Sequence, residues 1–278
     1  MTIHQILQTA QKKYPLIPLE DIELLMAKSL HRSLNYLYKN PDKILNRSSQ
    51  STFWRLVDRR QNNYSVAYLL GNKEFYGLNF LVSKHTLIPR PDSEIMIEEA
   101  IKYLQNNKIS LPKIIDIGTG SACLIISLAK NYKNPAKFYA ADNSGQALKV
   151  AKTNARKHAL KKQITFYKSN LLQNVEPGTF DVVLANLPYL TQDQLKEPSI
   201  KKEPRNALYG GNNGLYFYEK LLKQLPKYLN KKYLILLEID PEQELTIQKI
   251  AEKFLPKTKL QIIKDLSNKS RLLKIEHK

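Results

Sequence analysis

Cysteine, glycine and long apolar runs are scarce in this sequence, and each absence narrows the class of protein. The 278 residues contain a single cysteine, Cys123, which excludes a framework of intramolecular disulfides. No run approaches the roughly 18 to 20 apolar residues that a membrane-spanning helix needs. Residues 1–5 lack the basic start and long apolar stretch of a secretory signal. We therefore expect a cytoplasmic protein without a membrane partner.

Acidic side chains are also scarce: the sequence has 25 aspartates and glutamates but 44 lysines and arginines, which gives a formal net charge of +19. A strongly basic chain raises the expectation of a nucleic-acid partner. However, only 9 of the basic residues are arginine, the usual residue for bidentate recognition of phosphates and bases. The excess charge is spread along the chain. We favour a solvated lysine-rich surface and expect no direct nucleic-acid substrate.

The absence of glycine before Gly71 suits a compact helical region. Apolar residues recur there at helical spacing, beginning with Ile3 and Ile6. Residues 73–88 alternate apolar and polar side chains around Gly77, which predicts a hairpin. Asp92 is a suitable N-cap for a helix after the hairpin. We expect a helical domain over residues 1–72, a hairpin linker over 73–88 and a second domain over 89–278.

Short apolar stretches alternate with helical stretches from residue 113 onward. Buried strands that alternate with helices argue for a largely parallel sheet covered on both faces. The predicted fold class is therefore α/β. The expected strands cover residues 113–117, 137–141, 164–167, 182–185, 233–238, 260–264 and 271–275.

The stretch IIDIGTGSACL, residues 114–124, places two glycines where a strand turns into a helix. Glycine there lets the backbone approach a ligand closely. The turn lacks the third glycine of a dinucleotide-binding motif and the lysine of a phosphate-binding loop. Asp142 ends the next strand, where a carboxylate can bond two ribose hydroxyls or cap the following helix. Asp116 can bond the amine of an amino-acid ligand or orient the glycine turn.

The stretch FDVVLANLPYLTQ, residues 180–192, ends a buried strand with an amide, a proline and a phenol. The order strand, acid-x-Gly-x-Gly, helix, strand, acid and then Asn-x-Pro-Tyr resembles the class I S-adenosylmethionine-dependent methyltransferases, which have a Rossmann-like fold. The tetrapeptide marks the branch that methylates nitrogen conjugated to a planar π-system. In that chemistry the side-chain oxygen of Asn186 and the main-chain oxygen of Leu187 accept the substrate N–H groups. Pro188 fixes the turn, and Tyr189 stacks on the planar group.

Over nearly its full length the chain resembles the release-factor glutamine methyltransferases, the PrmC/HemK family. The motifs that carry this resemblance are GNKEFYGLNFLVSKHTLIPRPDSE (71–94), DIGTGSA (116–122), ANLPYL (185–190) and EPRNALYGGNNGLYFY (203–218). The resemblance implies S-adenosyl-L-methionine as the cofactor, and no metal. It implies the glutamine of the Gly-Gly-Gln motif in class I peptide chain release factors as the substrate. It also implies that the helical domain helps to bind the release factor. We expect the enzyme to be a monomer.

The same resemblance assigns the site residues. The cofactor contacts that it implies are Asp116, Gly118, Thr119, Gly120, Ser121, Ala122, Asp142, Asn170 and Asn186. The catalytic and substrate-binding set is Asn186, Leu187, Pro188 and Tyr189, with Arg90 as a further substrate contact. Three positions depart from the family pattern: Leu187 replaces a proline, Asn170 replaces an acid and Ala122 replaces a glycine. The last departure matters only if φ at Ala122 is positive.

Two other functions remain open at this point. Asn-Leu-Pro-Tyr also occurs in ribosomal RNA adenine dimethyltransferases, so with a net charge of +19 a ribosomal RNA adenine N-methyltransferase is the main alternative. Those enzymes place the helical domain after the methyltransferase domain, whereas 117 residues precede Gly118 here. The order of domains and the IPRP motif favour the protein substrate. The third possibility is an inactive methyltransferase-like binding module, against which Asp116, Asp142 and Asn186 argue.

Overall fold

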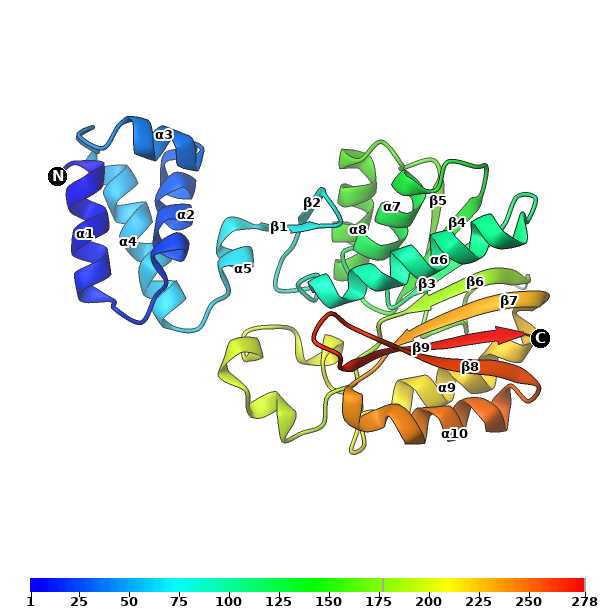
Figure 1. Cartoon of the computed structure of the whole chain (residues 1–278). Coiled ribbons are helices and arrows are strands. Elements are labelled where there is room, and N and C mark those ends of the chain that lie inside the picture. Colours follow the sequence, from blue (N-terminus) through cyan, green and yellow to red (C-terminus); the bar gives the residue numbers. More distant parts are fainter. Residues whose placement is uncertain (177, 278) are drawn as a thin grey trace. The chain divides into compact units, whose positions relative to one another are not determined.

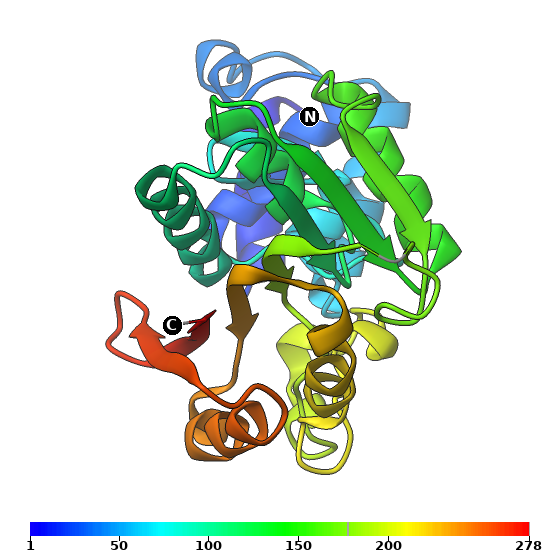
Figure 2. The same cartoon turned by 90° about the vertical axis from the view of Figure 1, so that its right-hand side faces the viewer.

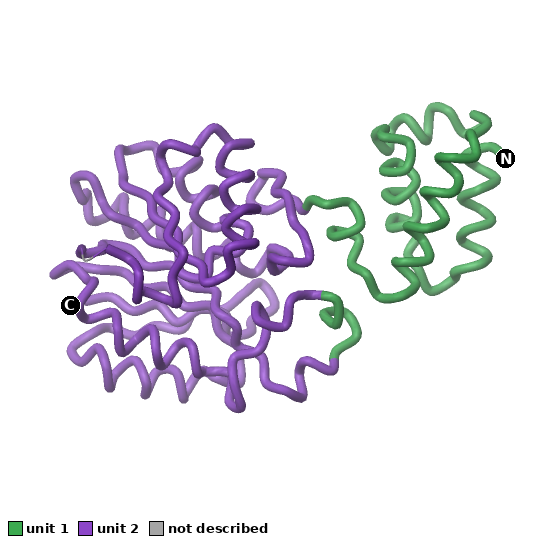
Figure 3. Tube along the Cα trace, turned by 180° about the vertical axis from the view of Figure 1, so that it is seen from behind, with its two compact units in different colours: residues 1–72, 197–202 green, residues 73–196, 203–278 purple. Residues whose placement is uncertain are grey.

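The computed structural model describes residues 1–176 and 178–277, and the chain forms two compact units (Figure 3). The first unit contains Met1–Asn72 together with the short segment Glu197–Lys202. The second contains Lys73–Lys196 and Glu203–Lys278. In the part of the chain that the structure describes, no helix combines the length and the apolar character needed to cross a membrane.

The first unit is built from short helices around its own apolar core (Figure 1). Thr2 opens the first helix with a capping box that it shares with Gln5. Gly71 ends the last helix in a left-handed conformation, with φ of 79°. Ile6 and Phe53 are fully buried in the core. The helices are α1 (Ile3–Lys13), α2 (Leu19–Leu30), α3 (Leu34–Lys39), α4 (Arg47–Gln61) and α5 (Val66–Leu70).

The second unit contains a seven-stranded sheet with the strand order β5-β4-β3-β6-β7-β9-β8. Strands β5, β4, β3, β6 and β7 pair in parallel, and β9 is antiparallel to β7 and β8. The predicted α/β fold with a mostly parallel sheet is therefore confirmed. The strands are β3 (Lys113–Ile117), β4 (Lys137–Asp142), β5 (Ile164–Lys168), β6 (Phe180–Ala185), β7 (Leu229–Glu238), β8 (Thr258–Lys264) and β9 (Ser270–His277).

Helices cover both faces of this sheet (Figures 1 and 2). Ile114 of β3 belongs to the core under α6, α7 and α8, whereas Ile115 belongs to the core under α9 and α10. Because both faces are buried, successive strand residues are apolar rather than alternating with polar ones. The helices are α6 (Glu94–Asn107), α7 (Cys123–Asn131), α8 (Gly145–Lys157), α9 (Tyr216–Gln224) and α10 (Glu244–Phe254).

The predicted hairpin consists of β1 (Asn72–Phe75) and β2 (Leu78–Leu81), and a buried amide ties β2 to the glycine turn. The side chain of Asn154 on α8 accepts the Leu81 N–H at 2.8 Å and donates to the Leu81 carbonyl at 3.0 Å. It also donates to the main-chain oxygen of Ser121 at 2.9 Å. The hairpin and the turn after β3 are thus held together by one side chain.

The helix after the hairpin does not begin with Asp92 as its N-cap, so that sequence prediction is wrong. Pro91–Ser93 form a 3-10 turn, and α6 begins at Glu94. The Asp92 carboxylate lies 3.1 Å from the guanidinium of Arg271 on β9 instead. A tertiary ion pair has replaced the local capping role.

Candidate active site

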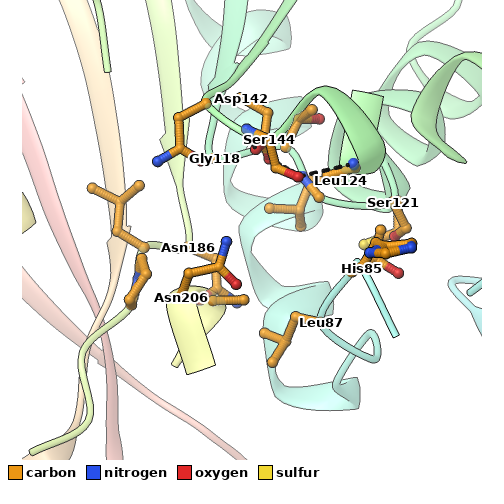
Figure 4. A pocket seen from close by; sticks show the side chains of 18 of the residues that line it. His85, Leu87, Gly118, Ser121, Leu124, Asp142, Ser144, Asn186 and Asn206 are labelled. Atoms are coloured by element: carbon orange, nitrogen blue, oxygen red, sulfur yellow. Dashed lines mark hydrogen bonds between the residues drawn. The ribbon is translucent and has the colours of Figure 1, made fainter. Parts of the chain in front are cut away.

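A cavity opens at the carboxyl ends of β3 to β6, which is where open parallel sheets bind ligands. It contains about 970 Å³ of atom-free space, part of it open to solvent. Figure 4 shows Gly118, Asp142 and Asn186 around this cavity. The predicted site residues that line it are Arg90, Gly118, Thr119, Gly120, Ser121, Asp142, Asn170, Asn186, Leu187 and Pro188. Asp116, Ala122 and Tyr189 were also predicted site residues but are not part of its lining.

Asp142 at the end of β4 joins two segments of the cavity wall. One carboxylate oxygen accepts the N–H of Gly120 at 2.9 Å, and the other accepts the N–H of Ser144 at 2.8 Å. The alternative role as cap of α8 belongs to Ser144, whose hydroxyl accepts the N–H of Ala147 at 3.1 Å. Burial raises the pKa of Asp142, and the two N–H donors oppose this shift. Since a carboxylate has about four lone-pair sites, Asp142 can accept further bonds from a ligand.

Asp116 supports the glycine turn from a buried position. Its Oδ2 accepts the hydroxyl of Thr119 at 2.6 Å, and the residue is 1% exposed. Its Oδ1 has no hydrogen-bond partner among the described residues. Burial raises the pKa of Asp116 to about 7, although the bond from Thr119 lowers it. A buried carboxylate oxygen without a donor is costly, and a donor from a ligand would remove that cost.

The glycine turn has left-handed backbone conformations that bring a second loop close to it. Gly118 has φ of 74° and Gly120 has φ of 54°. A Cβ atom at Gly118 would lie 2.9 Å from the side chain of Leu187, so glycine allows the loop after β6 to approach. Ala122 also has a positive φ, 64°. Its replacement of the family glycine therefore does matter, at a cost of about 1–2 kcal/mol.

The side chain of Asn186 is held by a chain of hydrogen bonds that ends on a buried carboxylate. Its Nδ2 donates to Ser93 Oγ at 3.1 Å, and the Ser93 hydroxyl donates to Oε2 of Glu238. Glu238 ends β7, is 1% exposed and also accepts the hydroxyl of Tyr189 at 3.2 Å. Tyr189 is thus bound through its hydroxyl to Glu238, and the stacking role of its ring stays a prediction.

A glycine-containing segment ahead of α9 supports the loop that carries Asn186. A Cβ atom on Gly210 would lie 2.4 Å from the main-chain oxygen of Pro188. A Cβ atom on Gly214 would lie 2.0 Å from the main-chain oxygen of Tyr189. The same oxygen accepts the side-chain amide of Gln243 at 2.8 Å. Only glycine fits at positions 210 and 214, which gives the GG…G part of the motif at 203–218 a steric reason.

Arg90 lines the cavity and also joins two of the motifs. Its guanidinium forms an ion pair with Glu203, and the second carboxylate oxygen of Glu203 accepts the N–H of Ile88 at 3.1 Å. Sequence reasoning did not single out Ser93, Glu203 or Glu238 as functional side chains. Ser93 and Glu203 nevertheless fall inside the motifs at 71–94 and 203–218, and Glu238 ends a buried strand, as Asp142 does.

The cavity suits a ligand that combines ribose hydroxyls, a flat base and a cationic amine. Asp142 can accept hydroxyl protons. Oδ1 of Asp116 is buried outside the lining and still lacks the donor that an amine reaching past the glycine turn would supply. Leu171 and Phe217 add apolar surface to the wall, and Asn170 lies beside Leu171 as a polar group for the base. S-adenosylmethionine combines these three features, so the residues present fit the cofactor that the sequence motifs imply.

Comparisons with known proteins define the class. Residues 108–276 match the methyltransferase domain, and residues 4–71 match the PrmC N-terminal domain. In fold, the chain is similar to a methyltransferase from Pyrococcus furiosus, with a TM-score of 0.53, 22% identity, and coverage of 79% of this chain and 95% of that one. It is also similar to the human methyltransferase 10 domain containing protein, with a TM-score of 0.51, 18% identity, and coverage of 73% and 89%. The protein is a methyltransferase that uses S-adenosylmethionine.

Two relatives cover nearly the whole chain. The release factor glutamine methyltransferase of Clostridium botulinum is 33% identical over 259 residues, which span 91% of this chain and 90% of that protein. The release factor glutamine methyltransferase of Rhodopirellula baltica is 32% identical over 272 residues, which span 96% and 92%. This chain belongs to the release factor glutamine methyltransferase family. The family resemblance predicted from the motifs is confirmed.

Proposed function

We propose that this enzyme methylates the side-chain amide nitrogen of the glutamine in the Gly-Gly-Gln motif of class I peptide chain release factors. The observation that carries the proposal is a single cavity lined by both Asp142 and Asn186. A carboxylate for the cofactor and an amide for the substrate therefore open into the same space. The names of the two full-length relatives support this choice of substrate.

The substrate nitrogen is a weak nucleophile because its lone pair is delocalised into the carbonyl. The enzyme helps by holding that nitrogen close and correctly aimed. Oδ1 of Asn186 and the main-chain oxygen of Leu187 accept the two N–H groups and stabilise the positive charge that grows on nitrogen. S-adenosylmethionine, when bound, supplies a methyl group on a positively charged sulfur. The surplus proton can leave the nitrogen after transfer, so no strong general base is needed.

Tyr218 fixes the backbone that carries the second acceptor. Its hydroxyl accepts the N–H of Leu187 at 3.2 Å and donates to the main-chain oxygen of Glu238. Tyr218 is fully buried, and burial raises its pKa well above the usual value, so it remains a protonated donor. The loop after β6 is thus tied to the end of β7 through its main chain as well as through Asn186.

Under the proposed function, residues 1–72 help to bind the release factor, since residues 4–71 match the PrmC N-terminal domain. Residues 73–88 then link this domain to a catalytic domain over residues 89–278. We place the enzyme in the cytoplasm, as a monomer without a nucleic-acid substrate. Under this scheme, deletion of residues 1–72 raises the KM for the release factor more than the KM for the cofactor.

The test is to incubate the enzyme with methyl-labelled cofactor and three acceptors: a folded release factor, a free Gly-Gly-Gln peptide and ribosomal RNA. Mass spectrometry should locate the label on the release-factor glutamine, weakly on the peptide and not on RNA. Activity should depend only modestly on salt concentration. With an RNA substrate, binding would instead fall steeply as salt rises, because the RNA releases counterions when it is bound. Label on adenine with an unmodified release factor would overturn the proposal in favour of the RNA methyltransferase.

A further inference from the structure

The hydrogen bonds around Asn186 have a defined direction because the group at the end of the chain, the carboxylate of Glu238, can only accept. An ionised carboxylate has no proton to donate, so both oxygens of Glu238 must accept. The hydroxyls of Tyr189 and Ser93 supply the two donors. The pKa of Glu238 is raised, chiefly by burial, and these two hydroxyls and the charge of Arg271 oppose that shift by stabilising the ionised form.

The bond from Ser93 to Glu238 also fixes the direction of the bond between Ser93 and Asn186. A serine hydroxyl has one proton, and that of Ser93 is donated to Glu238. Its oxygen can therefore only accept from Asn186, at 3.1 Å, so the Asn186 side chain must present its NH₂ group to Ser93. Ser93 is 3% exposed and Glu238 is 1% exposed, so the pair is held within the protein.

The orientation of an asparagine amide decides which groups it can bind. Rotation by half a turn exchanges the oxygen and the NH₂ group at almost no change in shape. With NH₂ on Ser93, the oxygen of Asn186 is free to accept a substrate N–H. With the amide reversed, an NH₂ group would face the NH₂ of the substrate, donor against donor.

We propose that Ser93 and Glu238 are positioning residues that fix the direction of the Asn186 amide and thereby select an N–H donor as the methyl acceptor. The inference rests on the proposed function, since it concerns how the same site holds its substrate amide. It assigns to the serine of IPRPDSE and to the acid at the end of β7 a role in methyl transfer that acts through the Asn186 amide.

The test is a double-mutant cycle measured as single-turnover methyl transfer to a folded release factor. Ser93→Ala removes the hydrogen bond that Asn186 donates to Ser93 and the one that Ser93 donates to Glu238. It should slow transfer roughly tenfold, while cofactor affinity and release-factor KM stay within about twofold. In an Asn186→Ala background, Ser93→Ala should have no further effect, because Ser93 acts only through Asn186. Ser93→Thr keeps a hydroxyl and should restore most of the rate.

Two further variants separate positioning from simple packing. Glu238→Gln offers one acceptor oxygen to two hydroxyls, so it should slow transfer in the wild-type background. It should slow transfer less in the Asn186→Ala background, where only its bond to Tyr189 can still matter. Ser127→Ala is the matched control: Ser127 is equally buried, its hydroxyl has no partner among the described residues, and it is not part of the cavity lining. It should transfer methyl groups at the wild-type rate.

The outcomes distinguish this inference from the proposed function. A wild-type enzyme that leaves the release factor unlabelled refutes the proposed function. A wild-type enzyme that labels it, together with a Ser93→Ala variant of equal rate, refutes the positioning role alone. A Ser93→Ala loss that persists in full in the Asn186→Ala background also refutes it, because the effect would then be structural.

Discussion

Arg90 and Glu203 are 113 residues apart in the sequence and form an ion pair that joins two loops of the cavity wall. The Glu203 side chain is 2% exposed, whereas that of Arg90 is 39% exposed. Glu203 also accepts the main-chain N–H of Ile88 at 3.1 Å. The buried Glu203 therefore holds the loop that carries the more exposed arginine, and the contact of Arg90 with a substrate stays a prediction.

Glu203→Ala should destabilise the second unit, because it leaves the Ile88 N–H without its acceptor. A buried unsatisfied donor costs about 1–3 kcal/mol, which urea unfolding should detect. Asp193→Ala is the control: Asp193 pairs with Lys196 at 2.7 Å, but both side chains are largely exposed. Its unfolding midpoint should not change measurably. Equal midpoints for both variants would contradict the organising role of Glu203.

Asp142→Ala should weaken cofactor binding roughly ten- to a hundredfold, because charge-assisted bonds to the ribose are worth about 1–3 kcal/mol. Titration calorimetry with S-adenosylmethionine measures this. Asp181→Asn is the control, since Asp181 is also buried and accepts the N–H of Lys113 at 2.8 Å, but it lies near the start of β6. Unchanged affinity in a folded Asp142→Ala variant would remove this residue from the cofactor site.

If the cationic amine of the cofactor reaches Asp116 past the glycine turn, it requires that carboxyl to be ionised, and cofactor affinity should fall as the pH drops through about 7. The folded-state pKa of Asp116 is raised from 3.8 to about 7. Protonation of this group therefore stabilises the free enzyme at low pH, and that contribution is lost as the pH rises through about 7. Cofactor binding near neutral pH should then release a proton.

Calorimetry in two buffers of different ionisation enthalpy measures this proton release. Burial also raises the pKa of Asp142, so the assignment needs a variant of Asp116 alone. Asp116→Asn should remove the release and flatten the pH dependence. If the variant releases as many protons as the wild type, Asp116 is not the titrating group.

Asn186→Ala should slow methyl transfer far more than it weakens cofactor binding. Loss of a preorganised polar group at the reacting centre typically costs 100-fold or more, by order of magnitude. Single-turnover kinetics and calorimetry on the same preparation separate the two effects. A rate within a fewfold of the wild type would reduce Asn186 to a turn residue.

Gly214→Ala should destabilise the second unit more than Gly77→Ala does. Both glycines have a positive φ, 70° and 69°, so alanine strains the backbone equally, by about 1–2 kcal/mol. Only at Gly214 does the new Cβ meet an atom closely, the main-chain oxygen of Tyr189 at 2.0 Å. Overpacking should add about 1–3 kcal/mol in thermal or urea unfolding and should lower turnover. Similar losses for the two variants would mean that the loop after β6 shifts freely.

The sequence by itself determined the sheet and the motifs of the cavity. Strand β3 was predicted over residues 113–117 and is observed as Lys113–Ile117. Burial on both faces of a parallel sheet demands a continuous apolar run, which can be recognised locally. Gly118, Asp142 and Asn186 were also identifiable, because each ends or follows such a run at a position where parallel strands present ligand-binding groups.

Only the tertiary structure decided which partners these residues have. Asn186 bonds Ser93 across 93 residues, and Ser93 bonds Glu238 across 145. Asp92 appeared to be a local helix cap, yet it pairs with Arg271 of a distant strand. The hydroxyl of Tyr189 is bound to Glu238, although the motif suggested only a stacking ring. Local patterns specify where a strand ends, whereas the direction of a side chain depends on donors and acceptors that packing brings together from distant parts of the chain.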